Sequence, residues 1–114
     1  MSVTYRYHHV GIPTTSPVEG MTRVEHLRIS CTDHESNPFG IQWMCYDAEC
    51  AVPPLVREVA HVAFEVDDLE AEMAGHQVLI APNSPSPGLT VAFIVDDGAP
   101  VELMRFDAPP GDGS

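Results

Sequence analysis

The sequence contains no lysine, and its five arginines face 17 aspartates and glutamates, which gives a formal net charge of −12. Nucleic-acid backbones and anionic membrane surfaces are bound through clustered positive charge, so this balance argues against either as the main partner. It favours a solvated, self-repelling surface instead. With 44% hydrophobic residues the chain can still form a core, and its 114 residues suffice for one domain but not for two independent cores.

Cysteine is also scarce, and no long apolar run occurs. Cys31, Cys45 and Cys50 are odd in number and lack CxxC spacing, which argues against a self-contained disulfide framework and against a zinc ribbon. The longest clearly apolar stretch, residues 91–95, is far too short for a membrane span. The first six residues carry no apolar run of the secretory-signal type. We therefore expect a cytoplasmic protein with free thiols and no membrane partner.

Several common catalytic motifs are missing from the sequence. It has no GxGxxG dinucleotide motif, no P-loop, no GxSxG nucleophile elbow and no HExxH zinc motif. The three cysteines show no pattern of histidine partners, so a cysteine nucleophile is not favoured.

Apolar and β-branched runs dominate what the sequence does contain. One helix is marked over residues 67–75, where Asp67 can cap the N-terminus, Glu70 completes a capping-box-like arrangement and Gly75 ends it. Pro53 and Pro54 disfavour regular structure in the linker after residue 46. Turn-forming residues occupy positions 83–88 and 96–98. Seven runs predict strands, at residues 5–12, 24–32, 40–46, 60–66, 78–81, 89–95 and 101–106.

The order of these segments repeats within the chain. Residues 9–12 (HVGI) resemble residues 61–64 (HVAF), and residues 41–48 resemble residues 101–108. The interval from His9 to Gln42 is 33 residues, and that from His61 to Glu102 is 41. The first copy is therefore 8 residues shorter. Two prolines and a glycine at positions 13–20 make a helix improbable where the second copy has one.

Alternation along the strands places both repeated histidines beside small residues. His9 shares a face with Gly11, and His61 shares one with Ala63, which leaves room above the sheet. Glu102 stands between two apolar neighbours in its strand. A glutamate in that position is either solvent-exposed or has a partner that offsets its desolvation.

Taken together, residues 7–12 (YHHVGI), 61–69 (HVAFEVDDL) and 101–104 (VELM) resemble the vicinal oxygen chelate superfamily, which includes glyoxalases, bleomycin resistance proteins and extradiol dioxygenases. The resemblance implies an α+β fold of two βαβββ modules, whose mixed sheet curves round a cleft. The first module would lack most of its helix. The predicted organisation is module one at about residues 3–47, a linker at 48–59, module two at 60–106 and a flexible tail at 107–114.

The resemblance also implies a divalent metal ion held by the first and last strand of each module. Carried over by position, its ligands are His9, Gln42, His61 and Glu102. Two imidazoles, one carboxylate and one amide suit Zn, Fe, Ni, Mn or Co in a site with open positions. Glutamine is a weak ligand by itself, and Gln42 is equally compatible with a strand facing water. Glu102 is also the candidate catalytic base, because no independent base is evident.

The implied substrate is a small molecule with adjacent oxygen atoms, converted by isomerase, lyase or dioxygenase chemistry. The alternative is metal-free binding or sequestration of a small molecule, as in bleomycin resistance proteins, and a third hypothesis is a dimerising structural module. The uncovered face of module one predicts a homodimer. Side chains on the same predicted strand faces as the ligands are candidate substrate contacts, namely Tyr7, Met44, Tyr46 and Met104.

The other histidines are divided between surface and cleft. Strand parity puts His8 opposite His9, so we expect His8 on the surface and His9 as the ligand. His34 falls in a loop that we expect to be solvated, with a lid over the cleft as the alternative. Parity leaves open whether His26 and Arg28 line the cleft or face solvent.

Overall fold

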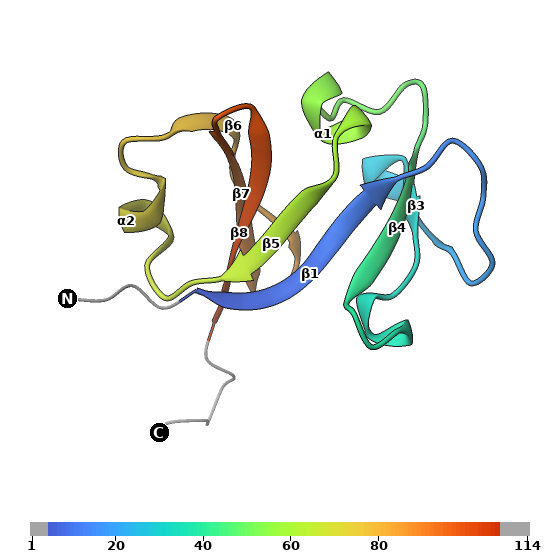
Figure 1. The fold of residues 1–114 in the computed structure, drawn as a ribbon, viewed down its shortest axis with the longest axis horizontal. Helices are drawn as coiled ribbons and strands as arrows, with labels where there is room; N and C mark the ends of the chain where they lie inside the picture. The colour runs from blue at the N-terminus through green and yellow to red at the C-terminus, as the bar shows by residue number, and fades with distance from the viewer. Residues whose placement is uncertain (1–4, 108–114) are drawn as a thin grey trace.

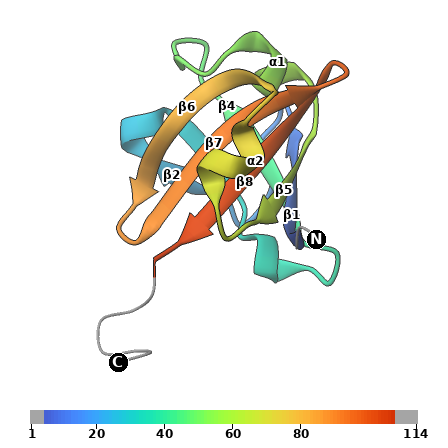
Figure 2. The same cartoon turned by 90° about the vertical axis from the view of Figure 1, so that its left-hand side faces the viewer.

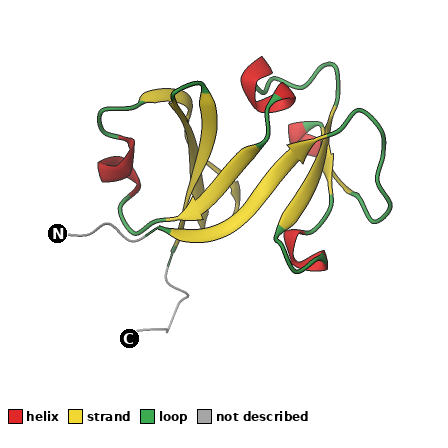
Figure 3. Cartoon of the chain, viewed as in Figure 1, coloured by secondary structure: helices red, strands yellow, loops and turns green. Residues whose placement is uncertain are grey.

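The computed structural model of the protein describes residues 5–107. One mixed sheet of eight strands curls into a half-barrel, and only short helices accompany it (Figures 1 and 3). The α+β class and the curved mixed sheet are therefore confirmed. Among residues 5–107, no helix is long and apolar enough to cross a membrane. The strands are β1 (Arg6–Pro13), β2 (Thr22–Val24), β3 (Ile29–Cys31), β4 (Ile41–Tyr46), β5 (His61–Glu65), β6 (Gln77–Ser86), β7 (Leu89–Asp96) and β8 (Ala99–Phe106).

Two α-helices and two 3₁₀ turns complete the described chain. They are α1 (Pro54–Glu58), α2 (Leu69–Met73), η1 (Glu25–Leu27) and η2 (His34–Ser36). Residues 14–21 join β1 to β2 without a helix, as predicted from Pro13, Pro17 and Gly20. Residues 108–114, most of the predicted tail, lie outside the described residues, as do residues 3 and 4 at the predicted start of module one.

The strand order places the first and last strand of each predicted half at the centre of the sheet. The order is β2-β3-β4-β1-β5-β8-β7-β6. β1 and β5 run antiparallel to each other, while β1 is parallel to β4 and β5 is parallel to β8. In Figure 1, β1 and β5 form the floor of the half-barrel, and the remaining strands rise on either side.

The register of these four strands aligns the predicted ligands in two neighbouring rows. Gly11 stands opposite both Gln42 on β4 and His61 on β5. Ala63 stands opposite both His9 on β1 and Glu102 on β8. Each row therefore has a small residue at its centre and a polar side chain on either side of it.

The main hydrophobic core lies on the outer side of the half-barrel, between α2 and the strands β7 and β8. Figure 2 shows α2 lying across β7 and β8, the two strands that it contacts. α2 thus covers the outer face of these two strands. The core cluster consists of Val66, Leu69, Ala92, Ile94 and Leu103.

The cap of α2 differs from the sequence prediction by one residue. The carboxylate of Asp68, not that of Asp67, accepts a hydrogen bond from the Ala71 backbone N–H at 3.1 Å. Glu70 consequently sits one position too early for the predicted capping box. Its carboxylate instead accepts a hydrogen bond from Arg105 at 3.3 Å.

The predicted strand at residues 24–32 is wrong, because the chain reverses in its middle. Arg28 adopts the left-handed conformation (φ 57°, ψ 45°) after η1, and β2 and β3 pair antiparallel on either side. The predicted turn at residues 83–88 is also mostly wrong. β6 continues to Ser86 through register irregularities opposite β7, which accommodate its prolines, and the turn is confined to Pro87 and Gly88.

The predicted linker is not wholly irregular. α1 occupies residues Pro54–Glu58, and Val56 on it is buried. Pro54 lies in the first turn, where its missing N–H would have no intrahelical partner in any case. The proline pair therefore starts a helix here instead of preventing one.

Candidate metal centre

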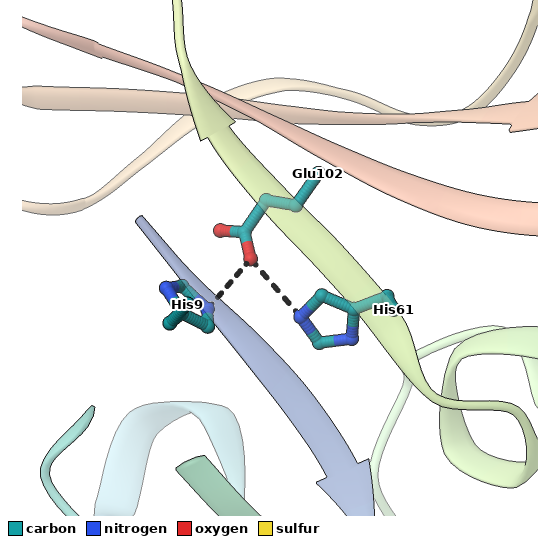
Figure 4. A group of neighbouring side chains, drawn as sticks. All are labelled: His9, His61 and Glu102. Carbon is teal, nitrogen blue, oxygen red and sulfur yellow. Dashed lines mark hydrogen bonds and ion pairs between the residues drawn. The ribbon is translucent and has the colours of Figure 1, made fainter. Parts of the chain in front are cut away.

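Three side chains converge from three adjacent strands of the floor and wall (Figure 4). His9 comes from β1, His61 from β5 and Glu102 from β8. Nε2 of His9 lies 3.3 Å and Nε2 of His61 lies 3.1 Å from the same oxygen, Oε1 of Glu102. The three residues are only 5%, 2% and 9% exposed, respectively. One potential ligand atom from each lies within 4.8 Å of the other two, so a single ion can contact all three.

Gly11 makes room for this arrangement. A Cβ atom on Gly11 would lie 2.3 Å from Cε1 and 2.7 Å from Nε2 of His61, so the imidazole lies directly over the backbone of β1. Gly11 is not among the glycines with positive φ, so the requirement is for space and not for an unusual backbone conformation. The predicted role of a small residue beside the histidines is thus confirmed at Gly11.

The carboxylate of Glu102 stays ionised despite its burial. Burial alone would raise the pKa of Glu102, but hydrogen bonds from His61 and His9, together with their charges, lower it to about 2. The two histidines are therefore the partners that offset the desolvation of Glu102 between its apolar neighbours. The site therefore offers one negative oxygen and two imidazole nitrogens at a single point, the donor set of the two-histidine, one-carboxylate triads that bind divalent metals.

The second nitrogens of the two histidines have different surroundings. Nδ1 of His61 is buried and has no hydrogen-bond partner among the described residues. Nδ1 of His9 lies 2.8 Å from Nδ1 of His8. The residues present fit a bound divalent ion. The two Nε2 atoms converge, and Gly11 has no Cβ atom that would block the ring of His61.

The triad forms part of the wall of a cavity of about 810 Å³ on the inner side of the half-barrel. Gln42, Met44, Tyr46 and Met104, all predicted as ligands or substrate contacts, line it. Burial and then the charge of Glu102 raise the pKa of the Tyr46 hydroxyl, so this hydroxyl remains a hydrogen-bond donor. Most of the remaining wall is apolar, contributed by side chains that include Ile29, Val56, Ile80, Leu89, Val91 and Phe93.

Gln42 reaches the cavity from β4, on the far side of Gly11 from His61. Its neighbour there is Cys31, whose thiol pKa is raised by burial and partly lowered by a hydrogen bond with Gln42. Gln42 therefore faces the same cavity as the group of His9, His61 and Glu102.

The structure does not bring Tyr7 to this cavity. Tyr7 is 52% exposed, and its hydroxyl donates a hydrogen bond to the Phe39 carbonyl oxygen at 2.7 Å. The pairing of β1 with β5 shifts register between Tyr7 and His9, so the strict alternation on which the prediction rested fails at this point. His8, which was expected on the surface, instead lines the cavity beside His9.

Two further histidines accompany His8. His34, on η2, also lines the cavity, and its ring centroid lies 4.3 Å from that of His8. His34 thus reaches the cavity, while its neighbours Asp33, Glu35 and Ser36 are exposed, as expected of a solvated loop. His26 and Arg28 line the cavity as well. Burial, followed by the charges of His9 and His34, lowers the pKa of His8 and favours its neutral form.

A second group of potential ligands within residues 5–107 is less suited to a metal. Asp33, His34 and Glu35 are consecutive, and both carboxylates are exposed. Asp33 already accepts a hydrogen bond from the Glu35 backbone N–H at 2.9 Å, as the cap of η2. Local capping explains this group without an ion.

Comparison with known proteins adds information on the fold alone. No protein-family model matches the sequence, and no curated protein matches it. Among solved structures, the hypothetical protein BH1468 from Bacillus halodurans C-125 is similar, with a TM-score of 0.59 and 17% sequence identity. The similarity covers 90% of this chain and 94% of that one. At this identity, the similarity establishes a shared fold and carries no function.

Proposed function

We propose that the protein binds a divalent metal ion through His9, His61 and Glu102 and acts on a small molecule that carries two adjacent oxygen atoms. The observation that carries the proposal is the convergence of two imidazole Nε2 atoms on one buried carboxylate oxygen in the wall of an 810 Å³ cavity. Gln42 is a candidate fourth ligand from the same inner face. The metal is one of Zn, Fe, Ni, Mn or Co.

The strand arrangement supports placing the chain in the vicinal oxygen chelate superfamily. β5, α2, β6, β7 and β8 follow one another in the order βαβββ, and β1 to β4 follow the same order without the helix. In each half the first strand is parallel to the last. We infer two modules related by an internal repeat, with the proposed ligands on their central strands.

A bound ion would act as a Lewis acid toward two neighbouring substrate oxygens. The chain's own residues would bind and orient the rest of the substrate. Met44 and Met104 offer flexible apolar contacts to its carbon skeleton. The protonated hydroxyl of Tyr46 can donate a hydrogen bond to a substrate oxygen. A carboxylate with a pKa of about 2 is a weak base at neutral pH, so we assign Glu102 first to binding the ion.

Isomerase, lyase and dioxygenase chemistry all fit this proposal, because each begins from a substrate held through adjacent oxygens. The donor set and the mostly apolar wall of this cavity do not distinguish among the three. The choice of these three reaction classes therefore rests on the proposed family, while the site itself supports metal and small-molecule binding.

Metal-free binding of a small molecule is the second candidate function. One observation favours it: Glu102 already has a hydrogen-bond partner in His61 at 3.1 Å, and Nε2 of His9 lies 3.3 Å from the same carboxylate oxygen, so the three side chains can satisfy one another. In that case the triad would be a structural element of the wall, and the cavity would hold its ligand through apolar contacts and through Tyr46.

Metal content distinguishes the two candidates. Protein purified without chelators would be analysed by elemental mass spectrometry, before and after soaking with each candidate metal. We expect about one equivalent of metal in the wild type, and loss of most of it in His9→Ala, His61→Ala and Glu102→Gln. His26→Ala, which changes a cavity histidine outside the triad, is the matched control and should retain the metal. A wild type that holds no stoichiometric metal, even after soaking, would leave metal-free binding as the function.

A further inference from the structure

The two histidines of the triad differ in what holds their outer nitrogens. On a metal-binding histidine the nitrogen that does not bind the ion almost always hydrogen-bonds to a neighbouring group, which fixes the ring orientation and tautomer. Nδ1 of His61 has no such partner among the described residues. Nδ1 of His9 has one, because Nδ1 of His8 lies 2.8 Å away.

An irregularity in β1 makes this contact possible. Consecutive residues on a regular strand point to opposite faces, yet His8 and His9 both line the cavity. The register of β1 against β5 shifts between Tyr7 and His9, which lets the two rings lie on the same side. Their centroids are 5.0 Å apart with the ring planes at 75°, an edge-to-face arrangement.

The ring of His8 is itself held in place by two neighbours. His34 lies against it with centroids 4.3 Å apart, and Phe106 lies on it with centroids 5.6 Å apart. The rings of His34 and His9 are farther apart, with centroids separated by 5.7 Å. His8 therefore lies between the triad and η2, in contact with both His9 and His34.

We propose that His8 is a positioning residue for the metal centre, which holds Nε2 of His9 toward Glu102 through the hydrogen bond between the two Nδ1 atoms. In the metal-free protein, Nδ1–H of His8 donates to Nδ1 of His9, and Nε2–H of His9 donates to Glu102. In the metal-loaded protein, Nδ1–H of His9 donates to Nδ1 of His8, and the lone pair on Nε2 of His9 faces the ion.

The test combines metal affinity with a readout of the hydrogen bond itself. Only the affinity measurement rests on the proposed function, because the hydrogen bond exists in the metal-free protein. Co²⁺ affinity would be measured by competition with a chelator. The Nδ1–Nδ1 bond would be detected in wild-type, metal-free, ¹⁵N-labelled protein as a scalar coupling between the two nitrogens, and the His9 tautomer would be read from its ring ¹⁵N shifts.

Three variants separate the contribution of Nδ1 of His8 from that of its aromatic ring. His8→Phe keeps an aromatic ring against His34 and Phe106 but removes Nδ1. His8→Asn places an amide oxygen near the position of Nδ1 and serves as the conservative rescue. His34→Phe is the matched control, since it alters another cavity histidine and keeps a ring stacked on His8.

We expect Co²⁺ affinity to fall about 10- to 100-fold in His8→Phe, to recover most of that loss in His8→Asn, and to stay within about threefold in His34→Phe. The ring shifts of His9 should report a mixture of tautomers in His8→Phe alone. Unchanged affinity together with unchanged His9 shifts in a folded His8→Phe would overturn the proposal. So would the absence of the Nδ1–Nδ1 coupling in the wild type, a result that does not depend on any variant folding. If the wild type binds no Co²⁺ but shows the coupling, the proposed metal function fails, while the role of His8 in orienting His9 stands.

Discussion

The imidazole of His61 lies directly over the backbone of Gly11, so closely that a Cβ atom there would come within 2.3 Å of Cε1 of the ring. The two residues are opposite each other in the antiparallel pairing of β1 and β5. The pairing thus brings a glycine from one half of the chain beneath a proposed ligand from the other half. The geometry of the candidate site depends on this one missing side chain.

Replacing Gly11 with alanine should therefore displace His61. The added methyl group overlaps the ring, and relief of that clash should destabilise the fold by about 1–3 kcal/mol and weaken divalent-metal binding. Urea unfolding and a Co²⁺ titration would measure the two effects. Gly75→Ala is the control, because Gly75 has a φ of 81° and a Cβ atom added there would meet no other atom within 4 Å, so only backbone strain is introduced. Gly75→Ala should lose stability but keep the metal affinity, and equal losses of metal affinity in both variants would count against the steric account.

The ionisation of Glu102 predicts how stability depends on pH in the metal-free protein. Hydrogen bonds from the histidines lower its pKa from 4.5 to about 2 on folding, so the folded state favours the charged form. The resulting stabilisation is present above pH 4.5 and is lost as the pH falls toward 2, because the unfolded chain then binds the proton first. Denaturant unfolding between pH 6 and pH 2 should show a fall in stability on the order of 3 kcal/mol attributable to this group.

Glu102→Gln removes this ionisation and should flatten the stability profile over the same pH range. Glu70→Gln is the matched control, because Glu70 is an exposed glutamate in α2 whose pair with Arg105 is solvent-accessible. Its effect should be small. Profiles for Glu102→Gln and the wild type that remain parallel from pH 6 to pH 2 would show that Glu102 has no lowered pKa.

Asp68 and Asp67 provide a test of the start of α2. Removing the cap with Asp68→Ala should cost about 1 kcal/mol, since the Ala71 N–H would lose its side-chain acceptor. Asp67→Ala removes only an exposed contact with Arg6 at 2.9 Å and should cost less than about 0.5 kcal/mol. Thermal unfolding of the two variants compares them directly. A larger loss for Asp67→Ala would place the cap at the residue that the sequence suggested.

Much of the candidate site was predictable from the repeat within the sequence. The repeat aligns His9 with His61 and Gln42 with Glu102, and the resemblance to the vicinal oxygen chelate superfamily is what marks these four positions as candidate ligands. The small residues beside them also follow from the two-residue period of a strand, and the structure shows the space at Gly11 in use.

The features that the sequence did not reveal depend on local departures from regular structure. Parity assigned His8 to the wrong side because the register shift near His9 has no signature in residue type. The reversal at Arg28 was missed for a related reason, since a left-handed arginine has no distinguishing pattern. Asp67 and Asp68 are adjacent and chemically identical, so only the backbone conformation decides which one caps the helix.

The homodimer remains a prediction of the sequence. Light scattering at high protein concentration would measure the mass in solution. We expect twice the mass of the 12.4 kDa chain. A single chain mass over the whole concentration range would contradict the prediction and leave the metal site unaffected, because the three proposed ligands come from one chain.

We propose that one divalent ion binds between His9, His61 and Glu102. Anomalous diffraction from crystals grown with Co²⁺, recorded on either side of the cobalt absorption edge, would locate the ion directly. We predict one strong anomalous peak within coordination distance of Nε2 of His9, Nε2 of His61 and a carboxylate oxygen of Glu102. No peak at this position, or a peak only at the exposed Asp33–His34–Glu35 group, would contradict the account.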